Sequence, residues 1–360
     1  MKILFVYEYY YPHVGGAEVL LQSLAEGLVE LGHECKVVTL KLSNTKSYEL
    51  LNGVEIYRVK AFNRTLFTFL SLPKIIRLAS ECDIVHTFTY NAAFPAFIAA
   101  KLLGKRCVIT VHEVLNELWK ELGLIGGVYS LLERLILKLP FDAFVAPSIY
   151  TKRRIPKKAF VVYPGVDEKF KPLKSDFKSK LGLEGCFLCL AYGRPGFTKG
   201  FEYLVRAVQH VDIERFKLLL LLAREPAMGY RKILQLVKDL ELERKILILE
   251  EIPREELPKL VAACDCVVVP SLSEGFGFTA AESCAMGKIV LASRTGALPE
   301  VVSGKYIFFE PRNERAIARA ISKAYRGEIE RRGKRRFSIE RMAEEYLDIY
   351  TSILKQRSSV

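Results

Sequence analysis

The chain has 360 residues, half of them hydrophobic, and it carries 54 Lys and Arg against 41 Asp and Glu, a net charge of +13. This length suits two domains, and this apolar content excludes an intrinsically disordered chain. The positive charge indicates anionic partners, such as nucleotide phosphates, acidic lipid headgroups or nucleic acid, without choosing among them.

The first half of the chain alternates short apolar runs with helical stretches, which predicts a parallel sheet with helices on both faces. The expected strands are Ile3–Val6, Cys35–Leu40, Val54–Val59, Asp83–Phe88, Cys107–Val111, Phe144–Ala146 and Phe160–Val162. The expected helices are Ala17 to about Leu31, Leu72–Ala79 and Ala92–Leu103. The apolar start Met1–Tyr11 is followed by Pro12 rather than by a cleavage site, so we interpret it as a strand and not as a signal peptide.

The segment Leu115–Leu139 is rich in Leu and Ile, holds the only Trp, Trp119, and carries Lys120, Arg134 and Lys138. One interpretation is an amphipathic helix pair that packs on the first domain. Another is an element that contacts a membrane surface or the acceptor of a reaction. The sequence leaves both interpretations open.

The stretch Tyr163–Asp167 breaks the alternation with Pro and Gly and predicts a linker. The alternation then restarts, so the chain divides into two α/β halves of similar size. The expected strands of the second half are Phe187–Tyr192, Lys217–Leu222, Lys245–Leu249, Cys266–Val269, Ile289–Ala292 and Tyr306–Phe309. A last helix, Ile339 to about Leu354, follows the basic segment Arg331–Arg336.

Four places in the chain carry residues suited to binding, each at the end of a strand where an open α/β sheet binds its ligands. In the first half, Gly15 and Gly16 allow a phosphate to approach the start of a helix, although a glycine pair also occurs in plain turns. His112 follows a strand and could donate to a hydroxyl or a phosphate oxygen, or it could simply be a packed side chain.

The other two places lie in the second half. Gly193–Gly200 brings Arg194 and Lys199 to a helix start, a combination that suits a diphosphate, although two cations on a surface turn are the plainer alternative. The stretch Pro270–Glu282 runs from a buried strand through glycines into a helix and holds two carboxylates, Glu274 and Glu282. Such carboxylates could accept sugar or ribose hydroxyls, whereas either one alone could be a solvated or capping residue.

Taken together, these residues resemble the retaining glycosyltransferases of the GT4 family, which have the GT-B fold of two Rossmann-like doubly wound domains facing across a cleft. The resemblance covers nearly the whole chain. It rests on Gly15-Gly16, His112, Pro164-Gly165-Val166-Asp167, Gly193-Arg194 with Lys199-Gly200, and Pro270-Ser271 followed by Glu274-Gly275-Phe276-Gly277 and Glu282. It implies an acceptor-side domain of residues 1–163 plus about 338–360, a hinge at 164–167 and a nucleotide-sugar-binding domain at 168–337, with the C-terminal helix returning to the first domain.

The resemblance also implies roles for single residues. Those expected to bind the donor are Gly15, Gly16, Gly193, Gly275, Phe276, Gly277, Phe278 and Glu282. Those expected in catalysis are His112, Arg194, Lys199 and Glu274. In this scheme Glu282 holds the ribose hydroxyls and Glu274 the donor sugar, while Arg194, Lys199 and the Gly16 amide neutralise the diphosphate. His112 contacts a hydroxyl of the donor sugar.

The resemblance implies transfer of a hexose from a nucleotide-diphosphate sugar to a hydroxyl of a glycan, a lipid-linked glycan or a small polyol. The chain contains no Asp-x-Asp pair, so we predict that this transfer needs no metal or other cofactor. Fixed cations and amides would stabilise the charge that develops on the departing diphosphate. The resemblance further implies that this phosphate helps to deprotonate the acceptor. The loop Ala223–Pro226 departs from the Gly-Asp-Gly-like turn common in the family and leaves the choice of base open. Glu113 could steer the acceptor or could be solvated.

Two other functions compete with this one. A nucleotide-sugar epimerase on the same fold would change the sugar without an acceptor. A nucleic-acid-binding protein is suggested only by charge, and the chain lacks an aromatic and basic recognition motif, so we expect no nucleic-acid partner. No run of roughly 20 apolar residues occurs, so we expect a cytoplasmic enzyme, with peripheral contact to the anionic inner face of a membrane as a further expectation from the basic clusters.

Overall fold

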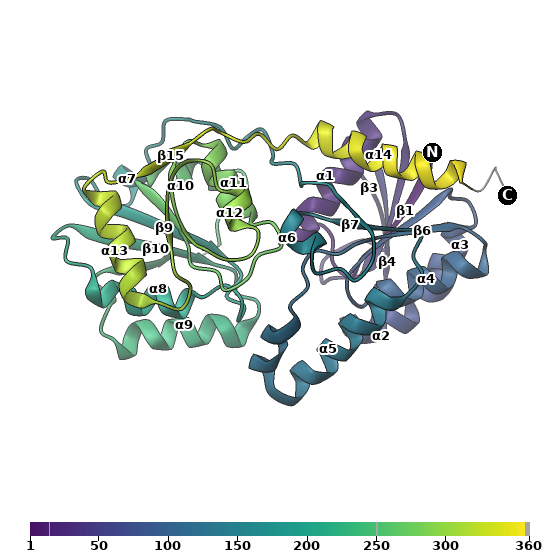
Figure 1. Ribbon diagram of the computed structural model, residues 1–360, viewed down its shortest axis with the longest axis horizontal. Helices are drawn as coiled ribbons and strands as arrows, with labels where there is room; N and C mark the ends of the chain where they lie inside the picture. The colour runs from purple at the N-terminus through teal and green to yellow at the C-terminus, as the bar shows by residue number, and fades with distance from the viewer. Residues whose placement is uncertain (14, 250, 357–360) are drawn as a thin grey trace. The chain divides into compact units, whose positions relative to one another are not determined.

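The computed structural model describes residues 1–13, 15–249 and 251–356, and its chain forms two compact units (Figure 1). The first unit is Met1–Gly165 together with the stretch that begins at Phe337, and the second unit is Val166–Arg336. The boundary after Gly165 lies within the predicted Pro-Gly linker, and the boundary after Arg336 follows the basic segment Arg331–Arg336. The last helix therefore belongs to the first unit.

The first unit is built on an eight-stranded sheet in the order β3-β4-β2-β1-β5-β6-β7-β8. The strands are β1 (Lys2–Val6), β2 (Glu34–Leu40), β3 (Tyr48–Leu51), β4 (Val54–Val59), β5 (Ile84–Phe88), β6 (Arg106–Thr110), β7 (Ala143–Ala146) and β8 (Ala159–Val161). All neighbours pair in parallel except β3, which pairs antiparallel with β4. Every residue of β5 is buried because helices cover both faces of the sheet, which is why its sequence does not alternate between apolar and polar residues.

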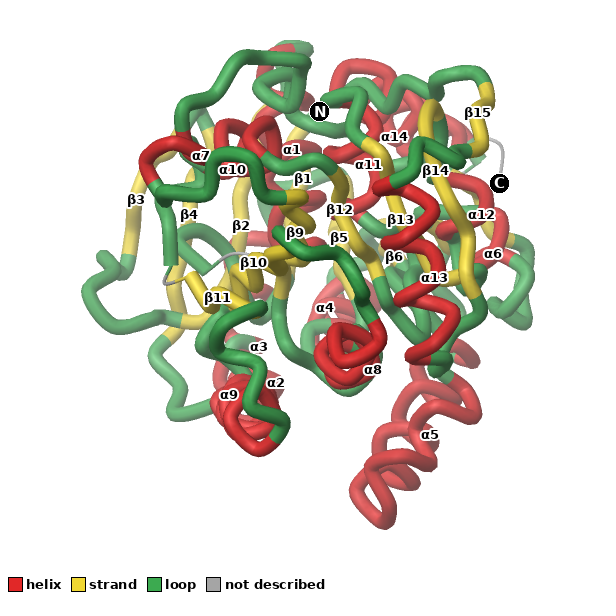
Figure 2. Tube along the Cα trace, turned by 90° about the vertical axis from the view of Figure 1, so that its left-hand side faces the viewer, coloured by secondary structure: helices red, strands yellow, loops and turns green. Residues whose placement is uncertain are grey.

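The helices of the first unit cover both faces of this sheet. They are α1 (Gly16–Glu30), α2 (Arg64–Leu70), α3 (Leu72–Ala79), α4 (Ala93–Leu102), the 3₁₀ helix η1 (Asn116–Leu122), α5 (Gly123–Lys138), α6 (Ile149–Lys152) and α14 (Ile339–Lys355). α1 lies against α14, and α3 lies against α4. α5 projects away from the rest of its unit in both views (Figure 1, Figure 2).

The second unit repeats this architecture with a seven-stranded sheet in the order β11-β10-β9-β12-β13-β14-β15. Its strands are β9 (Phe187–Gly193), β10 (Phe216–Leu222), β11 (Ile246–Leu249), β12 (Cys266–Val269), β13 (Ile289–Ser293), β14 (Gly304–Phe309) and β15 (Glu330–Arg332). Its helices are α7 (Phe177–Lys180), α8 (Phe201–Ala207), η2 (Val208–His210), α9 (Ala227–Asp239), α10 (Leu257–Ala263), α11 (Phe278–Ala285), α12 (Leu298–Val301) and α13 (Glu314–Tyr325). Only β15 runs antiparallel to its neighbour.

The predicted fold class of two Rossmann-like parallel sheets is confirmed, and several short elements were missed, among them β3, β15 and α2. β3 and β15 are edge strands whose residues are partly or fully exposed, so neither has the apolar run that marks a buried strand. α2 has seven residues, of which only Phe67 is buried. Among the described residues, no helix has the length and hydropathy that crossing a membrane would require.

Candidate functional site

Two loops of the second unit bring the predicted cations and carboxylates together. The loop after β9 starts at Gly193 and ends at Gly200, whose φ of 65° is accessible to glycine and which caps α8. A Cβ at Gly200 would lie 2.1 Å from the carbonyl oxygen of Pro270, so only glycine lets this loop approach the one after β12. The Leu272 amide donates to the Thr198 carbonyl at 2.7 Å and joins the two loops. β9 and β12 are neighbours in the sheet, and this adjacency places both loops at one edge.

Lys199 and Glu274 form an ion pair within these loops. The Lys199 Nζ lies 2.7 Å from Glu274 Oε1, and the Ser271 hydroxyl donates to the same oxygen at 2.7 Å. Glu274 is buried, and its carbonyl accepts the Ala297 amide at 2.8 Å. The lysine predicted for the diphosphate and the glutamate predicted for the sugar are therefore in direct contact, and the ion pair orients each group.

Glu282 lies in the second turn of α11 and is also buried. The Tyr192 hydroxyl, at the end of β9, donates to Glu282 Oε2 at 2.8 Å, and an Arg254 guanidinium nitrogen lies 3.7 Å from Oε1. Burial raises the pKa of Glu282 to about 7, although Arg254 and Tyr192 oppose the shift. Neither partner is predicted by the sequence pattern. Tyr192 looked like the last core residue of a strand, and Arg254 belongs to no motif.

The remaining predicted residues of the second unit surround these groups. Gly275, Phe276 and Gly277 form the turn into α11, where Gly277 has a φ of 96°. Phe276 is buried and packs edge-on against Phe278, with ring centroids 5.1 Å apart. Arg194 follows Gly193 directly and is half-buried. The Ala223 amide donates to the Gly193 carbonyl at 3.1 Å, so the divergent loop after β10 begins beside this turn.

In the first unit, the predicted glycines stand at the start of α1. Gly15 is the N-cap and Gly16 the first helical residue, as the motif required. Glu18, in the first turn, is buried, and its Oε1 lies 3.0 Å from His13 Nδ1. The His13 ring stacks on Tyr9 with centroids 4.3 Å apart. The chain before α1 is therefore held close to the helix start.

His112 follows β6 and is packed among aromatic rings. It stacks on Phe88 with centroids 5.1 Å apart and an interplanar angle of 8°, and it meets Tyr7 edge-on at 5.8 Å. Burial lowers the pKa of His112 to about 4, so the ring is neutral at neutral pH. Its Nε2 is buried and has no hydrogen-bond partner among the described residues. A buried nitrogen of this kind is suited to a ligand hydroxyl.

Glu8, at the carboxyl end of β1, is a buried carboxylate for which the sequence analysis predicted no role. Its Oε1 accepts the Asn91 amide at 3.1 Å, while Oε2 is buried and lacks a partner within the described part of the chain. Burial raises the pKa of Glu8 to about 7. Its only sequence signal was a charged residue two positions after a buried strand.

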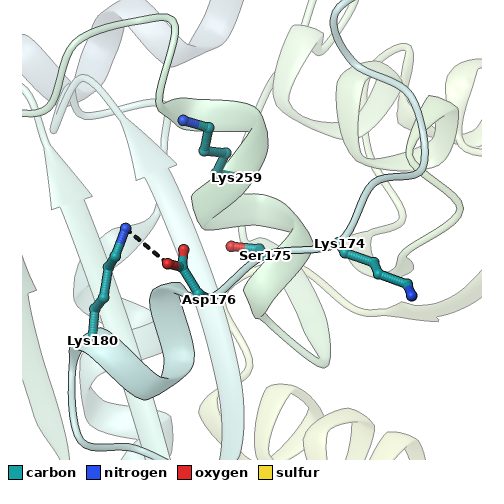
Figure 3. Close-up of a pocket in the computed structure, with 5 residues that line it drawn as sticks. All are labelled: Lys174, Ser175, Asp176, Lys180 and Lys259. Carbon is teal, nitrogen blue, oxygen red and sulfur yellow. Dashed lines mark ion pairs between the residues drawn. The ribbon is translucent and has the colours of Figure 1, made fainter.

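A surface hollow of the second unit contains none of the predicted site residues. It is lined by Lys174, Ser175, Asp176, Lys180 and Lys259 (Figure 3). These residues lie on α7, on α10 and just before α7, and α7 precedes β9, so the hollow lies toward the amino ends of the strands. In that part of the molecule Lys180 and Asp176 pair at 2.9 Å. Among the described residues, no group of three or more His, Cys, Asp or Glu side chains is arranged to hold a metal ion.

Comparison with known proteins adds family information to this geometry. Residues 14–170 match the family model "Glycosyltransferase Family 4", and residues 174–341 match "Glycosyl transferases group 1". The sequence is 27% identical over 391 residues to an uncharacterized glycosyltransferase of Methanocaldococcus jannaschii, covering 97% of this chain and 98% of that protein. It is 21% identical over 347 residues to a phosphatidylinositol N-acetylglucosaminyltransferase subunit of Saccharomyces cerevisiae, covering 90% of this chain and 75% of that protein. Among solved structures, Anabaena HepE in complex with UDP-glucose has a TM-score of 0.77 at 20% identity and covers 100% of both chains.

Proposed function

This chain belongs to the GT4-type glycosyltransferases, and on that premise we propose that it transfers a hexose from a nucleotide-diphosphate sugar to a hydroxyl acceptor with retention of configuration. The observation that carries the proposal is the arrangement of Lys199, Glu274 and Glu282. They provide one cation and two buried carboxylates at the ends of adjacent strands, where an open α/β sheet binds its ligands.

In the second unit, each of these groups matches one part of the donor. Glu282, held by Tyr192 and Arg254, accepts the ribose hydroxyls. Glu274 accepts a hydroxyl of the donor sugar, aided by the backbone amides at the start of α11. Arg194 and Lys199 face the diphosphate, where a guanidinium fork and an ammonium are suited to phosphate oxygens. The UDP-glucose bound to the structural relative HepE supports a donor of this class.

In the first unit, His112 and the start of α1 complete the assignment. The unpartnered Nε2 of His112 binds a hydroxyl of the donor sugar, and its low pKa keeps the ring uncharged during the reaction. Gly15 and Gly16 leave the backbone at the first turn of α1 open to a diphosphate oxygen, where the helix dipole favours negative charge.

The chemistry needs no protein nucleophile in this proposal. The bond between the sugar and the diphosphate breaks, and negative charge develops on the leaving phosphate, which Arg194 and Lys199 stabilise more strongly as that charge grows. The acceptor hydroxyl attacks on the same face of the sugar and transfers its proton to a phosphate oxygen. Because lysine and arginine supply the positive charge, we propose that transfer proceeds without a metal ion.

We propose a glycan or lipid-linked acceptor and peripheral contact of the first unit with an anionic membrane. α5 exposes five apolar side chains, with Leu124 94% exposed and Ile125 65%, followed by Val128, Leu131 and Leu135. α2 lies beside α5, because Arg64 donates to the Tyr129 hydroxyl at 3.2 Å. A helix that binds at a membrane interface typically combines an exposed apolar face with nearby cations. The name of the yeast relative, which includes phosphatidylinositol, supports this class of acceptor.

The first experiment screens the purified chain for binding and for transfer. A thermal-shift series with UDP-, GDP- and ADP-sugars identifies the donor, because a ligand that binds only the folded state raises the melting temperature. Transfer to glycan and polyol acceptors is then measured with EDTA present, and the anomeric configuration of the product is read by NMR. We expect a retained anomer and an unchanged rate in EDTA.

The variant Lys199→Ala tests the assignment of the diphosphate. We expect its turnover to fall by about tenfold or more while donor affinity changes less, because the lost charge acts mainly on the transition state. Lys174→Ala, which removes an exposed lysine away from the strand ends, is the matched control. An unchanged rate for Lys199→Ala would contradict the assignment, and conversion of the donor sugar without any acceptor would instead indicate an epimerase.

A further inference from the structure

Glu133 is a buried carboxylate on α5 that no motif of the sequence marked. It is 2% exposed, although many other residues of α5 are exposed. Four donors surround it. Its Oε2 accepts the Tyr90 hydroxyl at 2.9 Å, the Trp119 Nε1 at 3.1 Å and the Leu115 amide at 3.1 Å, and its Oε1 accepts the Asn116 amide at 3.2 Å.

These donors come from two loops that follow neighbouring strands. Tyr90 follows β5, while Leu115, Asn116 and Trp119 follow β6, with Leu115 capping η1 and the other two within it. The Tyr90 hydroxyl also lies 3.2 Å from the carbonyl of Glu113, the residue directly after His112. Glu133 therefore connects α5 to the backbone after His112 through the Leu115 and Asn116 amides, and through Tyr90, whose one hydroxyl proton is shared between Glu133 and the Glu113 carbonyl.

The number of donors indicates what this carboxylate does. A buried carboxylate is unfavourable unless donors replace its lost hydration, and here two backbone amides, a phenol and an indole do so. Packing also restricts this segment, because a Cβ at Gly126 would lie 1.7 Å from the carbonyl of Trp119. Trp119 further stacks on Tyr129 of α5, with ring centroids 5.2 Å apart.

We propose that Glu133 is a positioning residue for sugar transfer, which holds the segment from Glu113 to Trp119 in place and so orients His112 toward the donor sugar. This inference rests on the proposed function. Glu133 does not touch the reacting atoms, and it acts through Tyr90 and the backbone after β6. A displacement of about 1 Å at a group that contacts substrate is enough to reduce turnover strongly.

Trp119 is the only tryptophan of the chain, so its fluorescence reports on this segment alone. Two variants remove the contacts of Glu133 to different extents. Glu133→Gln keeps an oxygen for the three donors at Oε2 but turns its amide toward the Asn116 N–H, whereas Glu133→Ala removes all four acceptor contacts. Glu117→Gln, an exposed change on η1, is the matched control. Tyr90→Phe deletes the link to Glu113 and preserves the other three contacts of Glu133.

We expect acrylamide quenching of Trp119 to increase from the wild type through Glu133→Gln to Glu133→Ala. We also expect kcat to fall by about tenfold in Glu133→Gln and in Tyr90→Phe, because both disturb the segment beside His112. The Kd for the nucleotide-sugar should change less than kcat, because the donor contacts proposed for the second unit are unchanged, and Glu117→Gln should match the wild type in every measurement.

Several outcomes would overturn the proposal. One is a Glu133→Gln protein with increased Trp119 quenching but wild-type kcat, because Glu133 would then only stabilise the fold. Another is unchanged quenching in both Glu133 variants. If Glu133→Ala does not fold, Tyr90→Phe with wild-type kcat would still overturn the proposal. Failure of the proposed function looks different, because the wild type would then neither bind nucleotide-sugars nor transfer, whatever Trp119 shows.

Discussion

At the scale of single residues, Glu282 links protonation to donor binding. Its pKa is raised to about 7 by burial, so it is largely protonated at pH 6 and largely ionised at pH 8. Ribose hydroxyls donate hydrogen bonds, and an ionised carboxylate accepts them more strongly than a protonated one. A donor that binds Glu282 therefore favours the ionised form.

We predict that nucleotide-sugar affinity rises with pH through this range. Below pH 7 the donor must displace a proton from Glu282, so its Kd should increase by up to about tenfold for each pH unit. The diphosphate of a nucleotide-sugar lacks the monoester group that titrates near pH 6, so its own charge is constant. Isothermal titration calorimetry at pH 6, 7 and 8 measures how the Kd of the nucleotide-sugar changes with pH.

Two variants separate Glu282 from other titrating groups. Glu282→Gln should bind more weakly at pH 8 and with little pH dependence. Glu8→Gln is the matched control, because burial raises the pKa of Glu8 to the same value of about 7. His112 is neutral throughout this range. A wild-type slope that persists in Glu282→Gln and disappears in Glu8→Gln would assign the titration to Glu8 instead.

At the scale of elements, α14 is held to the first unit by a buried polar chain. The Tyr350 hydroxyl lies 2.5 Å from His86 Nδ1, and His86 Nε2 lies 2.9 Å from the Thr110 hydroxyl. The Thr110 hydroxyl in turn lies 2.8 Å from the Tyr346 hydroxyl. These groups join the last helix to β5 and β6. Gly165 supports the same docking, because a Cβ there would lie 2.5 Å from the Cα of Ile339.

We predict that Tyr350→Phe destabilises the protein by about 1–3 kcal/mol, because it leaves His86 Nδ1 buried without a partner. Urea unfolding, followed by circular dichroism, measures the change. Tyr346→Phe is the control and should cost less, because the Thr110 hydroxyl keeps its contact with His86. Equal stability of Tyr350→Phe and the wild type would show that the contact does not hold α14.

The second element of interest is the segment Leu115–Leu139, which forms η1 and α5. Its inner side packs as one interpretation expected, since Trp119, Gly126, Glu133 and Ile136 are buried. Its outer side exposes apolar residues, on which the proposed membrane contact depends.

We predict co-sedimentation of the protein with vesicles that contain phosphatidylglycerol and weaker binding to phosphatidylcholine vesicles, because apolar insertion and cation attraction act together. The double variant Leu124→Glu with Ile125→Glu should lose this binding. Met228→Glu, a change at an exposed apolar residue on α9, is the control. Equal and negligible sedimentation with both kinds of vesicle would contradict the membrane contact.

At the scale of the whole molecule, local patterns predicted the architecture well. Apolar runs of strand length, separated by helical stretches, predicted two parallel sheets, and a Pro-Gly break marked the passage from one half to the other. The motifs also lay at strand ends, and parallel strands place their carboxyl ends at one edge. This rule places the loops that hold Lys199 and Glu274 at the same edge, and the structure shows the Lys199 Nζ 2.7 Å from Glu274 Oε1.

The sequence by itself thus determined the fold class, the family resemblance and the identity of the candidate residues, because these depend on local periodicity and on short motifs. Only the tertiary structure decided which partners hold those residues. Tyr192 with Glu282, Tyr350 with His86 and Glu133 with Tyr90 are contacts between positions far apart in the chain. The pKa values of Glu8, His112 and Glu282 also follow from burial, which depends on the packing of neighbouring elements rather than on adjacent residues.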